Sequence, residues 1–577
     1  MLGWNSLVES LKAEKIKFFW TLPAGAGELF EELYDTPEIK VISVRKETSA
    51  VYMAMAESRL TGQPSVCWGT QSGGTGYMLP GFLEAYVTCT PVIQPSKTID
   101  TTVDGKGGEG EFDMVHNYMA MTKWSVKVPR ADRIPWYMNR AFTIATNGKP
   151  GPVFVEIPGD LGDEDVADMP KYVPSKRSLR STGDPELISQ AIKMILAAER
   201  PVILAGGGVV WSRASHDLIK FAEALGIPIL TTASGRGSIP EDHPLSIGLV
   251  GWYRTDISKQ VYEDTDLMIS IGARNESLET MTWKYPLPEN CKFLQIDIDP
   301  FEIGRTWPPD LAIVGDAKLI LNDLYKAGQS HIQKDRMKSP RIEALIKTKK
   351  DYEARIEEEC AEISSPIKTQ SIVRALNKIF GKNTILVNEN GMQDLWSYMC
   401  PYYKVLDIGG VIPPGAQTIM GAGVVGTIGA KLTAPDKNVI CTTGDGAFQM
   451  GMHEAATAVE YDAPVTWIIL DNYGLGWTYF SHMQTYGRKG EGEYKNRVDF
   501  TKFAEAINCY GERVDHSSNI ESALTNALNA NNDGESAILD FIVDPWNPGP
   551  GFREGSNNIT DEQLRELANK AKVTKNF

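Results

Sequence analysis

The sequence lacks a long hydrophobic run, a block of basic residues and any excess of positive charge. No apolar stretch approaches the roughly eighteen residues of a membrane-spanning helix, so we expect no association with a membrane. The 577 residues carry 58 Lys and Arg against 74 Asp and Glu, a formal net charge of −16. An acidic chain without a Lys/Arg cluster is not typical of proteins that bind nucleic-acid phosphates, so we expect no nucleic-acid partner.

Cysteine is also scarce. The seven cysteines are scattered, odd in number and form no CxxC motif, a pattern typical of reduced thiols in a cytoplasmic protein. The opening residues MLGWNSLVESLKAEKI spread acidic groups through an amphipathic pattern, so we expect neither a signal peptide nor a transit peptide. These features predict a cytoplasmic location.

The chain has instead the composition of a globular protein with several domains. Hydrophobic residues make up 42% and charged residues 23%, and the length suggests roughly three to four domains. Strand-like and helical segments alternate at 1–175, 185–328 and 366–544, which predicts an α/β domain in each range. A charge-dense helical connector fills 329–365. The tail at 545–577 begins rich in Pro and Gly and is interpreted either as a lid or as a docked surface tail.

The stretch Gly444–Gly476 carries the most informative pattern. Gly444-Asp445-Gly446 follows one apolar run, Asp471-Asn472-Tyr473-Gly474 follows another, and a helical segment separates them. This order predicts a βαβ unit with both polar turns at the carboxyl ends of neighbouring parallel strands, where open α/β sheets bind ligands. Asp445 and Asn472 would then converge as oxygen ligands suited to Mg²⁺ that also contacts phosphates. The alternative is two ordinary turns rich in Gly, Asp and Asn.

This unit resembles the metal-binding signature of thiamine diphosphate enzymes. In that family the Asp, the Asn and a carbonyl two residues beyond the Asn hold the metal on the cofactor diphosphate, and the matching residues are Asp445, Asn472 and Gly474. The usual Asn-Asn pair of the family has become Asp471-Asn472 here. The resemblance also assigns cofactor contacts to the residues around the two turns: Gly444, Gly446, Ala447, Leu475 and Gly476.

Two earlier segments match other cofactor loops of that family. Asn388 to Gln393 resembles its first diphosphate loop, with Gln393 where many relatives place His; a Gln side chain can still donate to a phosphate oxygen. Gln417 to Gly423 resembles the segment that props the cofactor in its bent shape, which makes Met420 the wedge between the two rings and Gly421 a backbone contact. Taken alone, Met420 would be core filler.

The first domain resembles the pyrimidine-binding domain of acetolactate-synthase-like enzymes. Glu47, at the start of a helical segment, lies where that family places its activating glutamate. A carboxyl group against the aminopyrimidine ring promotes removal of the thiazolium C2 proton. Without the resemblance, Glu47 would simply complement the positive end of a helix.

The middle domain matches the family's central domain in its order of motifs, and in that family this domain binds FAD, ADP or coenzyme A, or nothing. Glycines and an Asp at strand ends suit a nucleotide, but they also suit close strand–helix packing. The candidate nucleotide residues are Gly207, Arg274, Asp297 and Asp316.

The residues that choose the substrate are harder to identify. Trp477 to Glu493 should cover the substrate side, with His482 and Glu493 as candidate catalytic groups, although a Glu in such a loop is more often an exposed carboxylate. Acetolactate synthases usually carry Phe-Gln-Glu in a loop of the first domain that reads Glu109-Gly110-Glu111 here. Either this change marks another activity, or the loop has drifted without functional meaning.

The resemblance covers about residues 5–543 and implies three α/β domains (pyrimidine-binding, central nucleotide-binding-like and diphosphate-binding), each around a mainly parallel sheet. It implies thiamine diphosphate and Mg²⁺ as cofactors, and a homodimer or homotetramer in which Glu47 and Asp445 of different chains share one site. The leading prediction is a 2-hydroxyacyl-CoA lyase that releases formyl-CoA. The alternatives are an acetolactate-synthase-type carboligase acting on pyruvate or another 2-oxo acid, and a non-catalytic cofactor-binding subunit.

Overall fold

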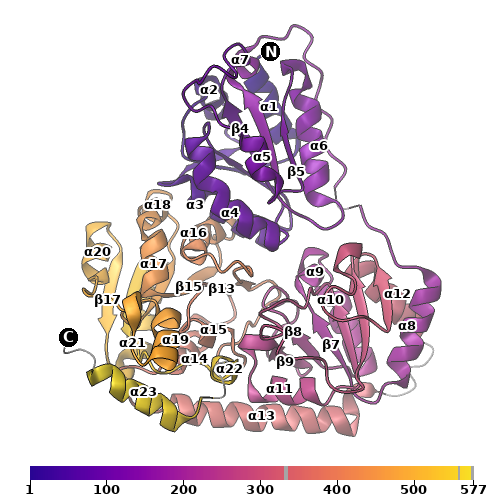
Figure 1. Ribbon diagram of the computed structural model, residues 1–577, viewed down its shortest axis with the longest axis vertical. Coiled ribbons are helices and arrows are strands. Elements are labelled where there is room, and N and C mark those ends of the chain that lie inside the picture. The colour runs from indigo at the N-terminus through magenta and orange to yellow at the C-terminus, as the bar shows by residue number, and fades with distance from the viewer. Residues whose placement is uncertain (178, 330–334, 556–558, 574–577) are drawn as a thin grey trace. The chain divides into compact units, whose positions relative to one another are not determined.

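The computed structural model describes residues 1–177, 179–329, 335–555 and 559–573. Residues 330–334 of the predicted connector, and residues 556–558 and 574–577 of the predicted tail, lie outside the described residues. The described chain folds into three six-stranded sheets in which all neighbouring strands are parallel (Figure 1). The predicted α/β class with a parallel sheet in each of three regions is confirmed.

The first sheet is built from residues 18–158 and has the strand order β2-β1-β3-β4-β6-β5. Its strands are β1 (Phe18–Thr21), β2 (Lys40–Ser43), β3 (Ser65–Trp68), β4 (Val92–Thr98), β5 (Trp124–Lys127) and β6 (Val153–Pro158). The helices of this region are α1 (Gly3–Ala13), α2 (Gly27–Tyr34), α3 (Glu47–Thr61), α4 (Gly73–Val87), α5 (Met114–Met119), α6 (Ile134–Thr146) and α7 (Gly159–Asp163).

The second sheet has the order β12-β11-β10-β7-β8-β9. Its strands are β7 (Pro201–Ala205), β8 (Ile229–Thr231), β9 (Ser246–Leu249), β10 (Leu267–Ile271), β11 (Lys292–Asp297) and β12 (Leu311–Val314). The accompanying helices are α8 (Pro185–Ala197), α9 (Gly207–Trp211), α10 (Ser215–Leu225), α11 (Asp256–Glu263), α12 (Ala317–Gln329) and the long, charge-rich α13 (Pro340–Cys360).

The third sheet has the order β14-β13-β15-β16-β18-β17, which repeats the strand order of the first sheet. Its strands are β13 (Thr384–Asn388), β14 (Val411–Ile412), β15 (Asn438–Gly444), β16 (Thr466–Asp471), β17 (Tyr510–Val514) and β18 (Ala537–Ile542). Its helices are α14 (Thr369–Phe380), α15 (Leu395–Tyr398), α16 (Ala422–Thr433), α17 (Asp445–Gly451), α18 (Ala455–Glu460), α19 (Gly476–Tyr486), α20 (Phe500–Ala506), α21 (Ile520–Asn532), α22 (Pro550–Gly555) and α23 (Asp561–Val573).

Contacts group the chain into two compact units. The first unit contains Met1–Arg180 together with Gly415–Pro435 and Gly451–Tyr461. The second contains Ser181–Pro414, Asp436–Met450 and Asp462–Phe577. Helix α16 therefore packs in the first unit, where the backbone of Gly429 lies so close to Met53 of α3 that a side chain at Gly429 would collide with it.

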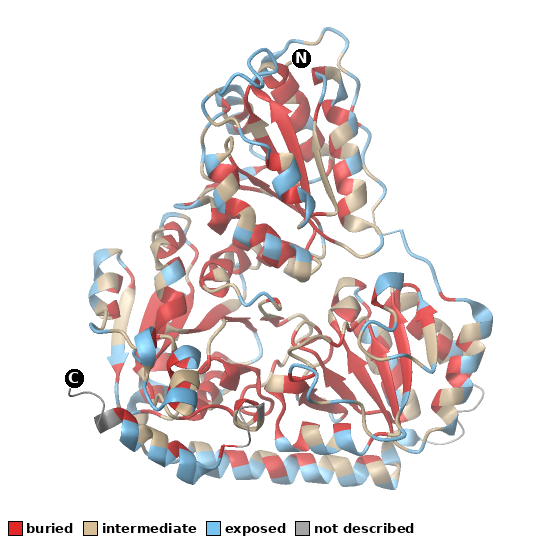
Figure 2. Ribbon diagram, viewed as in Figure 1, coloured by how far each residue is buried: buried red, intermediate tan, exposed pale blue. Residues whose placement is uncertain are grey.

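The strands form the buried interior of each region (Figure 2). Central strands such as β3 and β6 are buried along their whole length, whereas the edge strand β5 is only partly covered. Parallel sheets covered on both faces have nearly continuous apolar strands for this reason. Of the helices within the described residues, not one combines the length and the hydropathy needed to cross a bilayer.

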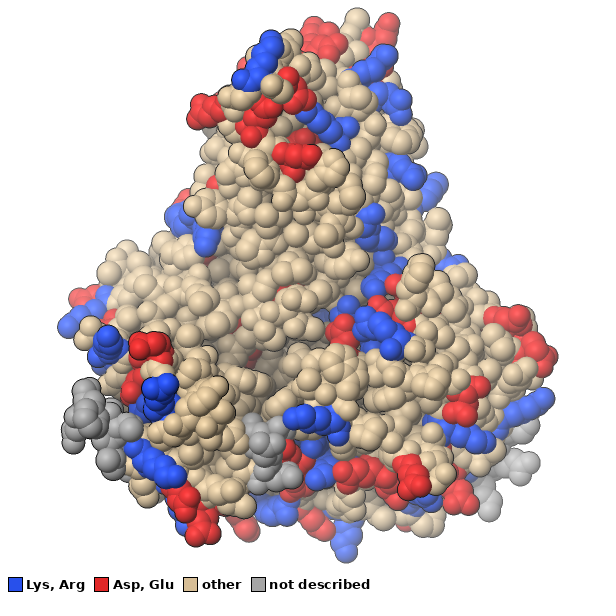
Figure 3. All heavy atoms as spheres, in the orientation of Figure 1, with Lys and Arg blue, Asp and Glu red and all other residues tan. Residues whose placement is uncertain are grey.

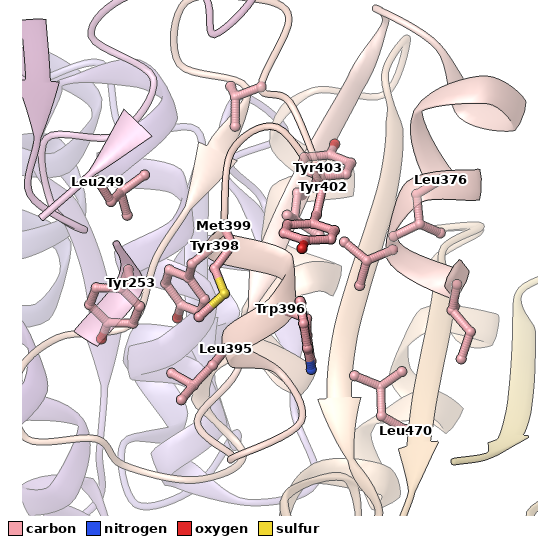
Figure 4. Close-up of a cluster of buried hydrophobic side chains, with 14 of the residues drawn as sticks. Leu249, Tyr253, Leu376, Leu395, Trp396, Tyr398, Met399, Tyr402, Tyr403 and Leu470 are labelled. Carbon is pink, nitrogen blue, oxygen red and sulfur yellow. The ribbon is translucent and has the colours of Figure 1, made fainter. Parts of the chain in front are cut away.

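A large apolar core runs through the second unit and joins its two sheets (Figure 4). The labelled side chains come from both: Leu249 ends β9 and Tyr253 follows it, whereas Leu470 lies in β16 of the third sheet. The ring of Tyr253 stacks on that of Tyr398 of α15, with the centroids 4.5 Å apart. Each fully buried side chain of this size contributes about 1.5–3 kcal/mol, so this core fixes the two sheets to each other.

A buried ion pair reinforces that junction. Arg236 donates from Nε and from a terminal nitrogen to the two oxygens of Glu241, both at 2.9 Å, and donates also to the carbonyl oxygens of Ser397 and Tyr403. Glu241 accepts from the Val405 N–H at 2.6 Å. On the face drawn in Figure 3, by contrast, acidic and basic side chains are interspersed on the surface.

Candidate active site

Three oxygen-bearing groups predicted to bind Mg²⁺ lie together at the carboxyl edge of the third sheet. Strands β15 and β16 are parallel neighbours that pair Gly444 with Leu470, so the turns after them emerge side by side. One atom of the Asn472 side-chain amide lies 3.2 Å from Asp445 Oδ1 and 2.8 Å from the Gly474 carbonyl oxygen. The predicted βαβ geometry therefore brings Asp445, Asn472 and Gly474 into one cluster.

The spacing within this cluster fits a magnesium ion. In octahedral coordination at about 2.0–2.1 Å, neighbouring ligand oxygens are about 2.9 Å apart, close to the two distances measured here. With its nitrogen toward the other two groups, the Asn472 amide donates to both; with its oxygen toward them, three oxygens converge. A magnesium ion held by few protein groups usually completes its coordination with water and ligand phosphate oxygens.

Burial of Asp445 also favours a cation. The side chain is 3% exposed, and burial, followed by the charge of Asp471, raises the pKa of the Asp445 carboxyl well above its ordinary value. Hydrogen bonds from the backbone N–H groups of Gly446 and Asn472 oppose this rise. An ionised carboxylate in such surroundings is costly until a positive charge binds beside it.

The turn that carries Gly474 is held by a short antiparallel pairing. Tyr494 N–H donates to the Tyr473 carbonyl at 2.9 Å, and Leu475 N–H donates to the Gly492 carbonyl at 2.8 Å. Gly474 has φ +148°, and a Cβ there would lie 2.2 Å from the Gly492 carbonyl oxygen. Glycine is therefore required at this position.

The two glycines that flank the metal turns differ in the space around them. A Cβ at Gly444 would meet no atom within 4 Å, whereas one at Gly476 would lie 2.4 Å from the Asn472 amide. Gly476 thus allows Asn472 to approach the turn. Gly446 and Ala447 lie in the first turn of α17, directly after Asp445.

Both polar atoms of the Gln393 side chain form hydrogen bonds with other parts of the protein. Its side-chain oxygen accepts from the Thr369 hydroxyl at 2.6 Å, and its nitrogen donates to the Asp544 carbonyl at 3.1 Å. The residue is almost completely buried. The side-chain NH₂ group has a second N–H donor, and its contact with a phosphate oxygen remains a prediction.

The two candidate catalytic side chains beyond the metal turn have different surroundings. Glu493 accepts from Lys489 Nζ at 2.6 Å, and a backbone bridge places it opposite Gly474. His482 lies on α19 with its ring 5.6 Å from that of Tyr486. Glu493 is thus next to the oxygen cluster but ion-paired, and its catalytic role and that of His482 remain predictions.

Trp477 joins the start of the tail in an aromatic cluster. Its ring lies 5.6 Å from Trp252 and 4.7 Å from Phe552 of α22, and it is 41% exposed. Glu554 pairs with Arg254 and with Lys259, the latter at 3.2 Å. The described part of the tail is therefore docked against the central region and against α19.

Glu47 begins α3 in the first unit, as predicted from the sequence. Its Oε1 lies 3.0 Å from the position that a Cβ of Gly74 would occupy, so glycine leaves room for this carboxylate. The Glu47 side chain is only partly buried. Such a carboxylate is available to a ligand nitrogen.

Met420 and Gly421 belong to the same unit, and Gly421 has φ +89° just before α16.

The loop that departs from the family pattern is well organised. Glu111 accepts from three glycine N–H groups, those of Gly105, Gly107 and Gly108, at 2.7–2.8 Å. These bonds, the one from Gly108 first, lower the pKa of the Glu111 carboxyl. Glu111 is therefore the residue that closes this glycine-rich loop.

The central-domain candidates each serve a local structural purpose. Arg274 pairs with Glu276 at 3.2 Å, and Asp297 Oδ1 accepts from the Asp299 N–H at 2.9 Å. Asp316 accepts from Ser212 and from two N–H groups at the start of α12. A Cβ at Gly207 would lie 3.1 Å from Ser234. Nucleotide binding by these residues remains a prediction.

Sequence reasoning missed Arg497, which contacts the metal turn. Its Nε lies 3.1 Å from Asp471 Oδ2, and its guanidinium covers the ring of Tyr473. The available signal was the acidic residue at 471 in place of the family's usual Asn, because a buried carboxylate requires a partner.

Comparisons with known proteins agree with this geometry. Three families described as thiamine pyrophosphate enzyme domains match the chain: the N-terminal TPP binding domain at residues 1–117, the central domain at 188–324, and the C-terminal TPP binding domain at 391–541. The probable acetolactate synthase large subunit of Methanocaldococcus jannaschii is 35% identical over 565 residues, covering 94% of this chain and 92% of the relative. The acetolactate synthase isozyme 3 large subunit of Escherichia coli is 28% identical over 577 residues, covering 98% and 96%.

Proposed function

Because this chain belongs to the thiamine pyrophosphate enzyme family, we propose that it is a carboligase of the acetolactate synthase type. It depends on thiamine diphosphate and Mg²⁺ and acts on a carbon–carbon bond next to a carbonyl. In the proposed reaction, one 2-oxo acid loses carbon dioxide, and the carbon that carried the carboxylate forms a bond to the ketone carbon of a second 2-oxo acid. The bound cofactor supplies the electron sink for that carbon.

The cluster of Asp445, Asn472 and Gly474 supports the cofactor class. The distances from the Asn472 amide to Gly474 O and Asp445 Oδ1, 2.8 and 3.2 Å, suit ligands of one Mg²⁺ ion. These three groups would hold the metal against the cofactor diphosphate. Glu47 would hold or release a proton at the pyrimidine ring, a task that suits a partly exposed carboxylate.

The choice of substrate is supported by similarity over the full length. Two relatives that cover more than nine-tenths of this chain are named probable acetolactate synthase large subunit and acetolactate synthase isozyme 3 large subunit, which supports the second of the two predicted activities. The leading prediction, a 2-hydroxyacyl-CoA lyase, receives no support from these relatives. In the altered loop, Glu111 matches the family's Glu and closes the loop, and the changes at Glu109 and Gly110 have no structural explanation.

The experiment is a direct comparison of the two substrates. Purified protein with thiamine diphosphate and Mg²⁺ is incubated with pyruvate, and separately with a 2-hydroxyacyl-CoA. We expect acetolactate and carbon dioxide in a 1:1 ratio from pyruvate, and no formyl-CoA from the thioester. Formyl-CoA without acetolactate would overturn the proposal.

A further inference from the structure

Asp471, the acidic residue beside the predicted metal ligand Asn472, is held in a compact arrangement with Tyr473 and Arg497. Asp471 Oδ1 accepts from the Tyr473 N–H at 3.0 Å, and Oδ2 lies 3.1 Å from Arg497 Nε. The guanidinium carbon of Arg497 lies 3.2 Å from the centroid of the Tyr473 ring. Asp471 is almost fully buried, and Arg497 is about four-fifths buried. We call these three residues the 471–497 clamp.

The clamp fixes a backbone turn that is unfavourable on its own. Tyr473 has φ +69°, in the left-handed region that non-glycine residues rarely adopt. The next residue, Gly474, has φ +148° and presents its carbonyl to the Asn472 amide. A side chain stacked on Tyr473 and a hydrogen bond to its N–H hold this turn from both sides. The direction of the Gly474 carbonyl thus depends on the clamp.

Charge explains why Arg497 is needed. Asp471 is a second buried carboxylate close to Asp445, and Asp540 of β18 adds a third, which Arg513 pairs at 2.7 Å. Without a cation of its own, Asp471 would be an uncompensated buried charge. An Asn at 471 would place no such demand on residue 497, so the two residues form a matched pair.

We propose that Arg497 and Asp471 are positioning residues that set the affinity of the site for Mg²⁺ and the cofactor diphosphate. They act through Tyr473 on the carbonyl of Gly474 and on Asn472, and do not touch the reacting atoms. The proposal rests on the cofactor class and is independent of the substrate. A protein that makes no acetolactate from pyruvate would therefore not contradict it.

The test starts from protein stripped of metal and cofactor, to which thiamine diphosphate is then added. Isothermal titration calorimetry measures the Kd of this protein for Mg²⁺. We expect Arg497→Met to weaken Mg²⁺ binding by about 10–100-fold, the range found when residues that orient metal ligands are removed. Arg497→Lys should recover part of the loss, because it keeps the charge but not the planar stacking group. The double variant D471N/R497M should melt at a higher temperature than Arg497→Met alone, since the unpaired buried carboxylate is gone.

Lys495→Met is the matched control, because Lys495 lies two residues before Arg497 and is exposed. It should leave Mg²⁺ affinity and melting temperature unchanged. Unaltered Mg²⁺ affinity in Arg497→Met would overturn the proposal, and a double variant that melts no higher than Arg497→Met would overturn the pairing of the two residues. Should Arg497→Met fail to fold, Arg497→Lys and Tyr473→Ala, compared with Tyr473→Phe, decide the question: the Lys and Ala variants should bind more weakly and the Phe variant normally.

Discussion

Asp445 occupies a position where a carboxylate destabilises the empty protein and stabilises the loaded one. We expect Asp445→Asn to raise the stability of the cofactor-free protein by about 1–3 kcal/mol, because the amide keeps the shape but carries no buried charge. The same variant should lose the stabilisation that Mg²⁺ and thiamine diphosphate give, about 2.7 kcal/mol at a hundredfold excess over Kd. Melting temperatures with and without both ligands measure the two effects.

The control for this variant is Asp462→Asn, which removes an exposed carboxylate near the start of β16. It should change neither melting temperature. A normal shift of the Asp445→Asn protein on adding Mg²⁺ and cofactor would show that Asp445 does not hold the metal.

The metal-turn residues could be predicted from the sequence because each directly follows a strand, and strands are visible in the local hydrophobic pattern. Asp445 and Asn472 lie directly after strands, and parallel pairing of those strands is enough to bring them together. Arg497 lies far along the chain from β15, in a segment without regular periodicity, so its contact with Asp471 had no local signal. The internal bonds of Gln393 were invisible for the same reason, since Thr369 and Asp544 lie on separate segments.

At the scale of elements, helix α3 is tied to strand β1 by one buried hydrogen bond. Trp20 Nε1 donates to Glu57 Oε2 at 2.7 Å. Burial raises the pKa of Glu57 to about 7, and the bond from Trp20 only partly opposes this rise. Below pH 4.5 the group is protonated in both the folded and the unfolded protein, so it costs no stability there. As pH rises from about 4.5 to about 7 the unfolded chain ionises first, and the folded protein loses up to about 3 kcal/mol.

Glu57→Gln removes this dependence, because the amide oxygen can accept the same bond without ionising. We expect the variant to match the wild type near pH 4.5 and to melt at a higher temperature at pH 8. Thermal unfolding across this range measures the difference, with exposed Glu38→Gln as the control. A variant that is less stable than the wild type at pH 8 would contradict the assignment.

The connection between the second and third sheets depends on Arg236 and Glu241. Removing only the cation leaves a buried carboxylate without its partner, so Arg236→Met should cost about 3–5 kcal/mol. The double variant R236M/E241Q should recover a substantial part, because the uncompensated charge is gone. Chemical denaturation of both variants measures this coupling, and equal losses in the two would argue that the pair's charge is unimportant.

For the whole molecule, the family resemblance places Glu47 and Asp445 of one site on two different chains. We therefore expect two inactive variants, Glu47→Gln and Asp445→Ala, to complement each other when their subunits are exchanged. Half of the dimers would be mixed and each would hold one intact site, so the mixture should regain about a quarter of the wild-type activity. Each variant alone is the control. A mixture that stays inactive after proven subunit exchange would mean that each chain builds its own site.

The first and third sheets connect their strands in the same order, β2-β1-β3-β4-β6-β5 and β14-β13-β15-β16-β18-β17. This repeat gives a single chain two sheet edges built in the same order, and the turns at each edge can carry different residues. Glu47 follows β2 in the first sheet, whereas Asp445 and Asn472 follow β15 and β16 in the third. One strand order thus presents the predicted proton-handling acid at one edge and the predicted oxygen ligands at the other.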